Sequence, residues 1–229
     1  MLPVTQIASS QIILTQGLPP LPKGRIVEVG GQAMTAFAAL AAAKTKGPIV
    51  WILPKEGYGE PFSTGPYAPG LKAFLNPDRL VFVWTVSAQE TLWAIEEALR
   101  ATGIGVVIGE LYGPPSLTQS RRFQLAAEQG GSLSLLLFKH PPRTSAATMR
   151  WICKSMPPPN GKASWDSTLW RWSLKKNKTG TIIKKGEGGG LLSPSSHKKD
   201  WWVVHNAKTG SLHLVAAPGS GLLEAPPGP

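Results

Sequence analysis

The sequence predicts an α/β fold, with a doubly wound parallel sheet and a C-terminal antiparallel β extension. Five short segments are apolar along their whole length, and segments with helical periodicity separate them. Strands buried on both faces of a parallel sheet have this composition, and the helices between them form the crossovers. After residue 157 the chain instead contains Trp-rich, basic segments that alternate as antiparallel strands do. We therefore expect a lead-in at 1–23, a core at 24–157 and an extension at 158–229.

Hydrophobic periodicity and helix-start signals locate the elements. The N-terminal lead-in is expected to be irregular or helical. Ser87 precedes Glu90 by three residues, and Ser116 precedes Gln119 in the same way, so both pairs form capping-box patterns. The expected strands are 25–29, 48–53, 79–85, 105–111, 132–138 and 148–156, the helices 32–45, 71–75, 88–102 and 117–129, and the extension has a strand from 169 and a hairpin of 200–206 with 211–217.

The first strand runs through Gly30 and Gly31 into an alanine-rich helix, where a nucleotide-binding protein has its phosphate loop. A Walker A loop needs G-x-x-x-x-G-K-[ST], because its backbone N–H groups cradle phosphates, its Lys meets their charge and its hydroxyl holds magnesium. Here Thr35 supplies a hydroxyl, but the second Gly and the Lys are absent. We therefore expect a degenerate nucleotide site, and a turn that packs Phe37 and Leu40 into the core.

The fourth strand ends in Glu110, where a Walker B strand would end in an Asp that holds magnesium. A lone carboxylate without a phosphate loop has nothing to act on. We therefore expect a hydrogen-bonding role for Glu110 at the strand end, and no catalytic residue, metal site or cofactor.

The positive charge of the chain is concentrated in its C-terminal part. The formal net charge is +11, of which residues 141–229 contribute 13 Lys and Arg against 4 Asp and Glu. A basic region of this density favours an anionic partner such as nucleic acid or an acidic protein face, although a solubilising surface without a partner is the alternative. The candidates for DNA or partner contact are Arg121, Arg122, Arg171, Lys175, Lys176, Lys178, Lys184, Lys185, Lys198 and Lys199.

Six of the nine Trp residues lie beyond residue 150. Trp170 and Trp172 alternate with Arg171, so one face of that strand is aromatic and the other basic. Such Trp residues could stack on the bases of single-stranded DNA, or they could fill the core of a small β unit. We favour burial for Trp170 and Trp172.

Cys153 is the single cysteine, which excludes an intramolecular disulfide and a Cys-x-x-Cys metal site. The longest apolar run is shorter than the roughly 20 residues needed to cross a bilayer. The N-terminus has no basic region before an apolar stretch, so we expect no signal peptide and a cytoplasmic location.

The order and spacing of several stretches resemble the ImuA family, the RecA-like and SulA-like accessory proteins of bacterial SOS mutagenesis, in the form usual in alphaproteobacteria. The Gly-rich loop around 184–199 and the long loop KEGYGEPFSTGPY depart from the family pattern. The stretches that carry the resemblance are RIVEVGGQAMTAFAALAA, GPIVWIL, YAPGLKAFLNPDRLVFV, QETLWAIEEALR, VVIGEL, LTQSRRFQLAAEQGGSLSLLL and SAATMRWICKSMP, followed by LWRWSLKKNKTG and DWWVVHNAKTGSLHLVAAP in the tail.

The resemblance implies a RecA-like core that has lost its nucleotide chemistry. It also implies a non-catalytic role in translesion DNA synthesis after DNA damage, beside ImuB, a catalytically inactive relative of the Y-family polymerases, and an error-prone polymerase of the replicative type. Contact with RecA is implied as well, and the basic tail could touch DNA. Two alternatives stay open: a SulA-like inhibitor of the cell-division protein FtsZ, and a weak RecA-like ATPase.

Overall fold

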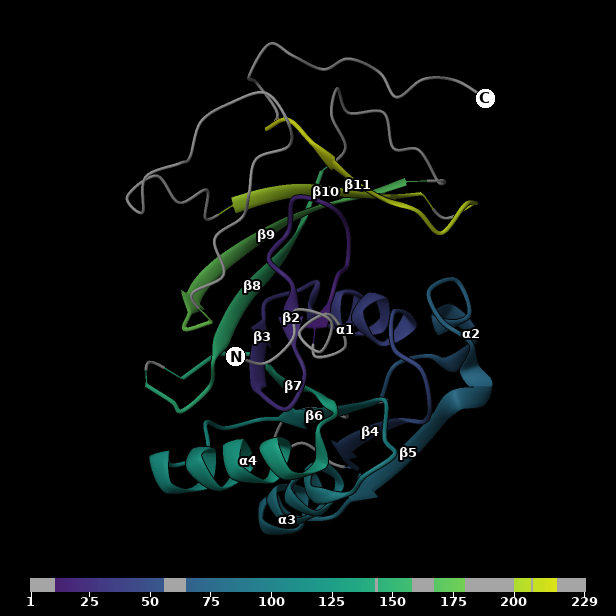
Figure 1. Cartoon of the computed structure of the whole chain (residues 1–229). Helices are drawn as coiled ribbons and strands as arrows, with labels where there is room; N and C mark the ends of the chain where they lie inside the picture. Colours follow the sequence, from purple (N-terminus) through teal and green to yellow (C-terminus); the bar gives the residue numbers. More distant parts are fainter. Residues whose placement is uncertain are drawn as a thin grey trace, which may run out of the picture.

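One nine-stranded sheet organises the chain (Figure 1). The computed structural model describes residues 11–55, 65–142, 144–157, 167–179, 200–206 and 208–217. The strands of the sheet are β3 (Ile26–Gly30), β4 (Ile49–Pro54), β5 (Leu80–Thr85), β6 (Val106–Leu111), β7 (Leu133–Phe138), β8 (Met149–Met156), β9 (Ser167–Asn177), β10 (Asp200–Asn206) and β11 (Leu212–Val215).

The order of strands across the sheet is β11-β10-β9-β8-β3-β7-β6-β4-β5. Every pairing from β8 to β5 is parallel, and β9, β10 and β11 then continue the sheet with antiparallel pairings. β8 joins the two parts, because it pairs with β3 on one side and with β9 on the other. The predicted fold class is confirmed: the protein has a RecA-like α/β fold with an antiparallel C-terminal extension.

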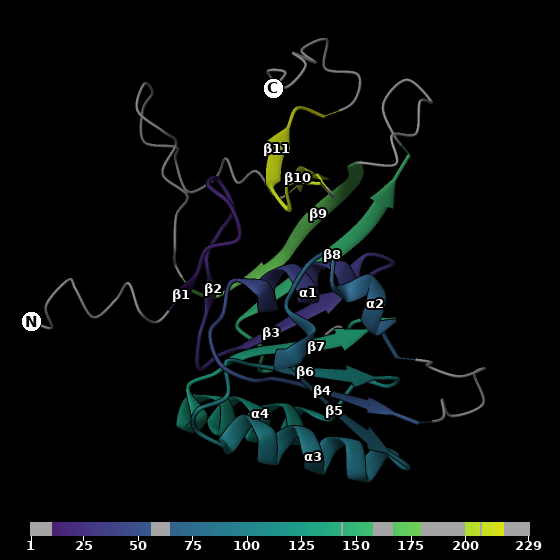
Figure 2. The same cartoon turned by 90° about the vertical axis from the view of Figure 1, so that its right-hand side faces the viewer.

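The helices lie on both faces of the sheet, as a doubly wound fold requires (Figure 2). One face carries α1 and α2, and the other carries α3 and α4. None of these helices is both long and apolar enough to span a membrane, in the ranges that the structure describes. The helices are α1 (Met34–Ala43), α2 (Ala68–Leu71), α3 (Ala88–Arg100) and α4 (Leu117–Gly130), and a 3-10 turn lies at Pro77–Arg79.

Both predicted capping patterns lie at the N-terminus of a helix, α3 and α4. The Ser87 hydroxyl accepts a hydrogen bond from the Glu90 amide at 3.1 Å, and the Glu90 carboxylate accepts one from the Val86 amide at 2.8 Å. At the start of α4 the Ser116 hydroxyl accepts from the Gln119 amide at 3.2 Å, while the Gln119 side chain accepts from the Ser116 amide at 2.8 Å. These bonds satisfy N–H groups that a helix leaves without partners at its N-terminus.

Two sequence-based predictions of secondary structure were wrong. The lead-in was expected to be irregular or helical, but its described part contains two short strands. β1 (Gln11–Ile12) and β2 (Leu21–Pro22) pair as an antiparallel ribbon. The short helix begins at Ala68 instead of Leu71, because Pro69 lies in its first turn, where its fixed φ angle favours helix initiation.

β5 is less buried than its apolar sequence predicts. It ends the sheet, so it has a neighbouring strand on one side only among the strands described. Val81 is 49% exposed and Trp84 is 44% exposed. Apolar sequence therefore marks a strand of the sheet but does not distinguish a central strand from an edge strand.

An aromatic layer on the α1 face joins the core to the extension. The Phe37 ring on α1 lies 4.8 Å from Trp172 of β9 and 5.7 Å from Trp151 of β8, between ring centroids. Trp151 in turn lies 5.4 Å from Trp201 of β10. Trp170 is 3% exposed and Trp172 is fully buried, so the preference for burial over base stacking at these two residues is confirmed.

His205 of β10 packs against the aromatic layer. Its ring stacks on Phe74 at 4.9 Å and on Trp170 at 5.9 Å, and the residue is 2% exposed. Its Nε2 has no hydrogen-bond partner within the described ranges. Burial lowers the pKa of His205 below its ordinary value, because the charged imidazolium would lose its hydration there.

We predict that this burial makes the stability of the protein fall in mild acid. The unfolded state binds a proton near the ordinary His pKa of about 6.5, and the folded state binds it only at lower pH, so the free energy of unfolding decreases as the pH falls below about 6.5. Chemical denaturation between about pH 8 and pH 5 measures this slope. His205→Phe should flatten it, whereas His213→Gln, at an exposed position, should leave it unchanged. An equal slope in the wild type and His205→Phe would contradict the prediction.

Candidate functional site: the degenerate loop and the basic strands

The loop between β3 and α1 is filled by protein backbone. The Ala33 amide donates a hydrogen bond to the Cys153 carbonyl oxygen of β8 at 3.1 Å, and the Met34 amide donates to the Gly31 carbonyl at 3.1 Å. Amides at the start of a helix that follows a glycine turn are the groups that bind phosphate in nucleotide-binding folds. Here the first of them is already bonded to the neighbouring strand.

The two glycines allow this close packing. Gly31 has φ +93°, and a Cβ added there would lie 2.3 Å from the Cys153 carbonyl oxygen. A Cβ added at Gly30 would lie 2.4 Å from Cγ of Pro141. Contacts inside the protein thus account for a glycine at both positions, since a side chain at either one would collide with its neighbour. Thr35, the remaining member of the predicted loop, is half-buried in the first turn of α1.

Glu110 lies two strands away from this loop. Its strand β6 pairs with β7, which pairs with β3, and neighbouring strands are about 4.8 Å apart. Its Oε1 accepts a hydrogen bond from Nε1 of Trp51 at 2.8 Å. This bond fixes the carboxylate against the α1-face core at the end of β6.

A cleft of about 260 Å³ opens at the carboxyl ends of β4 and β6. The N-terminal turns of α3 and α4 border it, but their capping bonds already use N–H groups of both turns. Its walls are mostly apolar. The residues that define it include Pro54, Leu92, Glu110, Tyr112 and Pro114.

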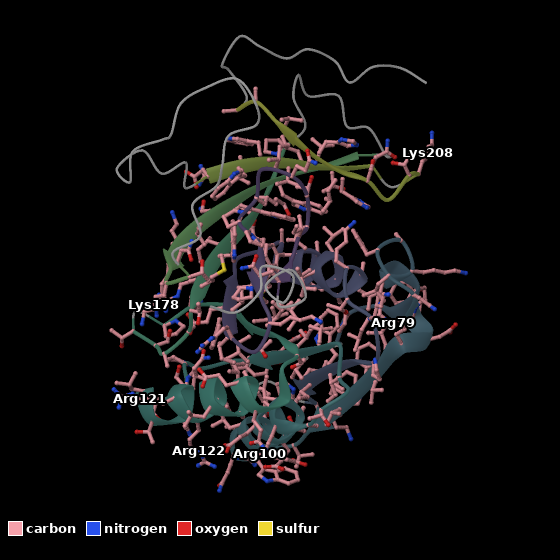
Figure 3. The ribbon with its side chains drawn as sticks, viewed as in Figure 1. Arg79, Arg100, Arg121, Arg122, Lys178 and Lys208 are labelled. Atoms are coloured by element: carbon pink, nitrogen blue, oxygen red, sulfur yellow. The ribbon has the colours of Figure 1, made fainter. Side chains whose placement is uncertain are left out.

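The two arginines of α4 differ in their surroundings (Figure 3). Arg122 pairs with Glu96 of α3 at 2.8 Å, and Glu96 also pairs with Arg100 at 2.7 Å. Arg121 is exposed and has no ion pair within the described chain. Arg122 therefore links α3 to α4, and of the two predicted contact residues Arg121 has its charge available.

The predicted cations of β9 fall on different parts of the strand. A register shift opposite Arg150 and Trp151 leaves Lys175 exposed at a bulge, and Lys178 is exposed just after the strand. Arg171 lies further along β9, on the face opposite Trp170 and Trp172. The predicted residues Lys184, Lys185, Lys198 and Lys199 lie outside the described residues.

Lys176 belongs to a partly buried polar cluster. Its ammonium group donates to the Ser145 carbonyl at 2.8 Å. Beside it, Nε of Arg150 donates to Oε2 of Glu28 at 2.7 Å, and Glu28 is 1% exposed. Burial lowers the pKa of Lys176, with Lys178 and Arg150 adding to the effect and Glu28 opposing it. The cluster ties β3, β8 and β9 together, so Lys176 is not a freely available cation.

The structure places two residues that the sequence analysis did not single out as contacts, Lys154 and Trp202, beside the predicted cation Arg171. Lys154 of β8 lies directly opposite Arg171, and Arg171 lies directly opposite Trp202 of β10. The alternation in DWWVVHN indicates that Trp201 and Trp202 point to opposite faces, but only the register shows which of them lies beside Arg171.

We predict that Gly31→Ala destabilises the protein far more than the same change at a second glycine with a similar backbone. Gly103 has φ +84°, and no atom lies within 4 Å of the place that an added Cβ would take, so Gly103→Ala should cost about 1–2 kcal/mol from the backbone alone. Gly31→Ala adds the collision with the Cys153 carbonyl, so its loss of unfolding free energy should reach at least about 3 kcal/mol. Urea denaturation of the two variants gives the comparison, and equal losses would show that Gly31 is not held against β8.

The chain is similar to curated relatives named Protein ImuA. No family model matches it. Protein ImuA of Caulobacter vibrioides strain NA1000 / CB15N is 31% identical over 163 residues, which cover 62% of this chain and 62% of the relative. Protein ImuA of strain ATCC 19089 / CIP 103742 / CB 15 gives the same values. The match thus spans 62% of the relatives' length, and the resemblance to the ImuA family that the sequence shows is confirmed.

Proposed function

We propose that this ImuA-like chain is a non-catalytic accessory protein of SOS-induced translesion DNA synthesis, which acts by binding other proteins of DNA-damage mutagenesis. The observation that carries the proposal is the hydrogen bond from the Ala33 amide to the Cys153 carbonyl. A RecA-like core whose phosphate loop is occupied by its own strand keeps its surfaces and lacks the means to hold a triphosphate. The similarity to Protein ImuA supports the biological setting.

The partners that we propose are an ImuB-like relative of the Y-family polymerases, an error-prone replicative-type polymerase, RecA and, through the basic strands, DNA. The exposed edge at β5 supports protein contact. Val81 and Trp84 are exposed on that strand, and Val86 and Trp93 are exposed in the segments that follow it. Exposed apolar side chains beside an edge strand commonly mark an interaction surface, because the strand edge offers hydrogen bonds to an added strand.

We predict that the full chain binds an ImuB-like protein and RecA in a pull-down with purified components. Trp84→Asp should weaken at least one of these interactions about tenfold, because it places a charge in the apolar surface at β5. Leu125→Asp is the matched control, since Leu125 is also exposed but lies on α4. Absence of binding to both proteins would remove the proposal, and equal losses in the two variants would exclude β5 as the contact.

We predict that magnesium and ATP do not bind the protein measurably. The loop has no Lys to meet the phosphate charge, and its first helical amide is already bonded. Isothermal titration calorimetry tests this directly, with a RecA-type ATPase as the positive control. A dissociation constant below about 100 μM would contradict the non-catalytic role.

A further inference from the structure

We propose that the outer face of β8, β9 and β10 binds single-stranded nucleic acid, with a base stacked on Trp202 and phosphates held by Arg171 and Lys154. This inference rests on the DNA contact of the proposed function and deepens it by naming the residues and the ligand, but it uses none of the protein contacts. It can therefore be tested on the chain alone, and its failure leaves those contacts untouched.

The strand register places the three side chains in one row across the sheet. Lys154 of β8 pairs with Arg171 of β9, and Arg171 pairs with Trp202 of β10. Side chains of directly paired residues project from the same face. With strands about 4.8 Å apart, the row is roughly 10 Å long.

This row lies on the face opposite the aromatic layer. Arg171 alternates along β9 with the buried Trp170 and Trp172, so its side chain projects away from them. Trp202 likewise alternates with Trp201, which is 2% exposed and donates a hydrogen bond from Nε1 to the Gly17 carbonyl at 2.9 Å. Figures 1 and 2 show that α3 and α4 lie at the other end of the sheet, below β6, β4 and β5.

Neither cation of this row forms an ion pair among the residues described. Lys154 is exposed, and Nε of Arg171 is buried without a hydrogen-bond partner in the same ranges. Asp200 is the one acidic residue in the described parts of β8 to β11, and it accepts a hydrogen bond from the Ser173 hydroxyl. Nε itself is closed to solvent, so a phosphate would meet the part of the half-buried Arg171 side chain that remains open.

The aromatic residue in line with the cations favours nucleic acid over an acidic peptide. Trp202 is half-buried, so part of its indole remains open beside Arg171. Sheets that bind single strands combine an aromatic platform for bases with cations that follow the backbone. An acidic peptide would need the two cations but would gain little from the indole, so Trp202 distinguishes the two ligands.

The test is fluorescence anisotropy of a labelled oligothymidine of about 20 nucleotides, titrated with the full chain at several salt concentrations. We expect Lys154→Glu to weaken binding about tenfold and to reduce the slope of the logarithm of affinity against the logarithm of salt concentration by about one. Trp202→Ala should weaken binding about tenfold, and Trp202→Phe should retain most of the affinity because a ring remains. Lys72→Glu, an exposed cation just after α2 on the other face, should change affinity less than about twofold.

Three results would overturn the proposal. One is the absence of binding by the wild type at low salt. Another is an effect of Lys72→Glu as large as that of Lys154→Glu, which would indicate diffuse attraction to a basic protein. The third is unchanged binding in Trp202→Ala, together with tighter binding of a labelled polyglutamate peptide, which would assign the face to an acidic protein segment. Retention of affinity by Trp202→Phe also separates lost stacking from lost folding in Trp202→Ala.

Discussion

The hydrogen bond between the start of α1 and the middle of β8 is the constraint on which the rest of this structure depends. The Ala33 amide reaches the Cys153 carbonyl because Gly31 has no side chain and adopts a positive φ angle. In a nucleotide-binding protein of this architecture, the same place holds a phosphate. Here the Ala33 amide is bonded to a strand, so the loop is tied to the sheet.

β8 has a second role that follows from this position. It is the last parallel strand and the first partner of the antiparallel extension, and its inward side chains belong to the aromatic layer that runs from Phe37 to Trp201. Its other face carries Arg150, which neutralises the buried Glu28, and Lys154, which faces outward. The basic strands are therefore joined to the core through β8, and the strand register sets which cations of their outer face lie side by side.

Much of the fold could be predicted from the sequence, because apolar strands, periodic helices and two capping boxes are local signals. Ser87 and Ser116 mark their helices through residues three positions away, and the alternation around Trp170 and Trp172 indicates a strand with one apolar face. The edge position of β5 could not be predicted in this way, since edge and central strands here have similar compositions. The candidate site was harder still to predict, because its contacts join segments that are distant in sequence. The Cys153 carbonyl packs against Gly31, and Trp202 lies beside Arg171.

Amide hydrogen exchange at Ala33, followed by NMR with and without magnesium and ATP, tests the central claim most directly. We expect a slowly exchanging amide in the free protein, because its hydrogen is bonded to the Cys153 carbonyl, and the same rate after nucleotide is added. Rapid exchange in the free protein, with protection that develops only when the nucleotide is present, would contradict this claim and show that the loop is open to a phosphate.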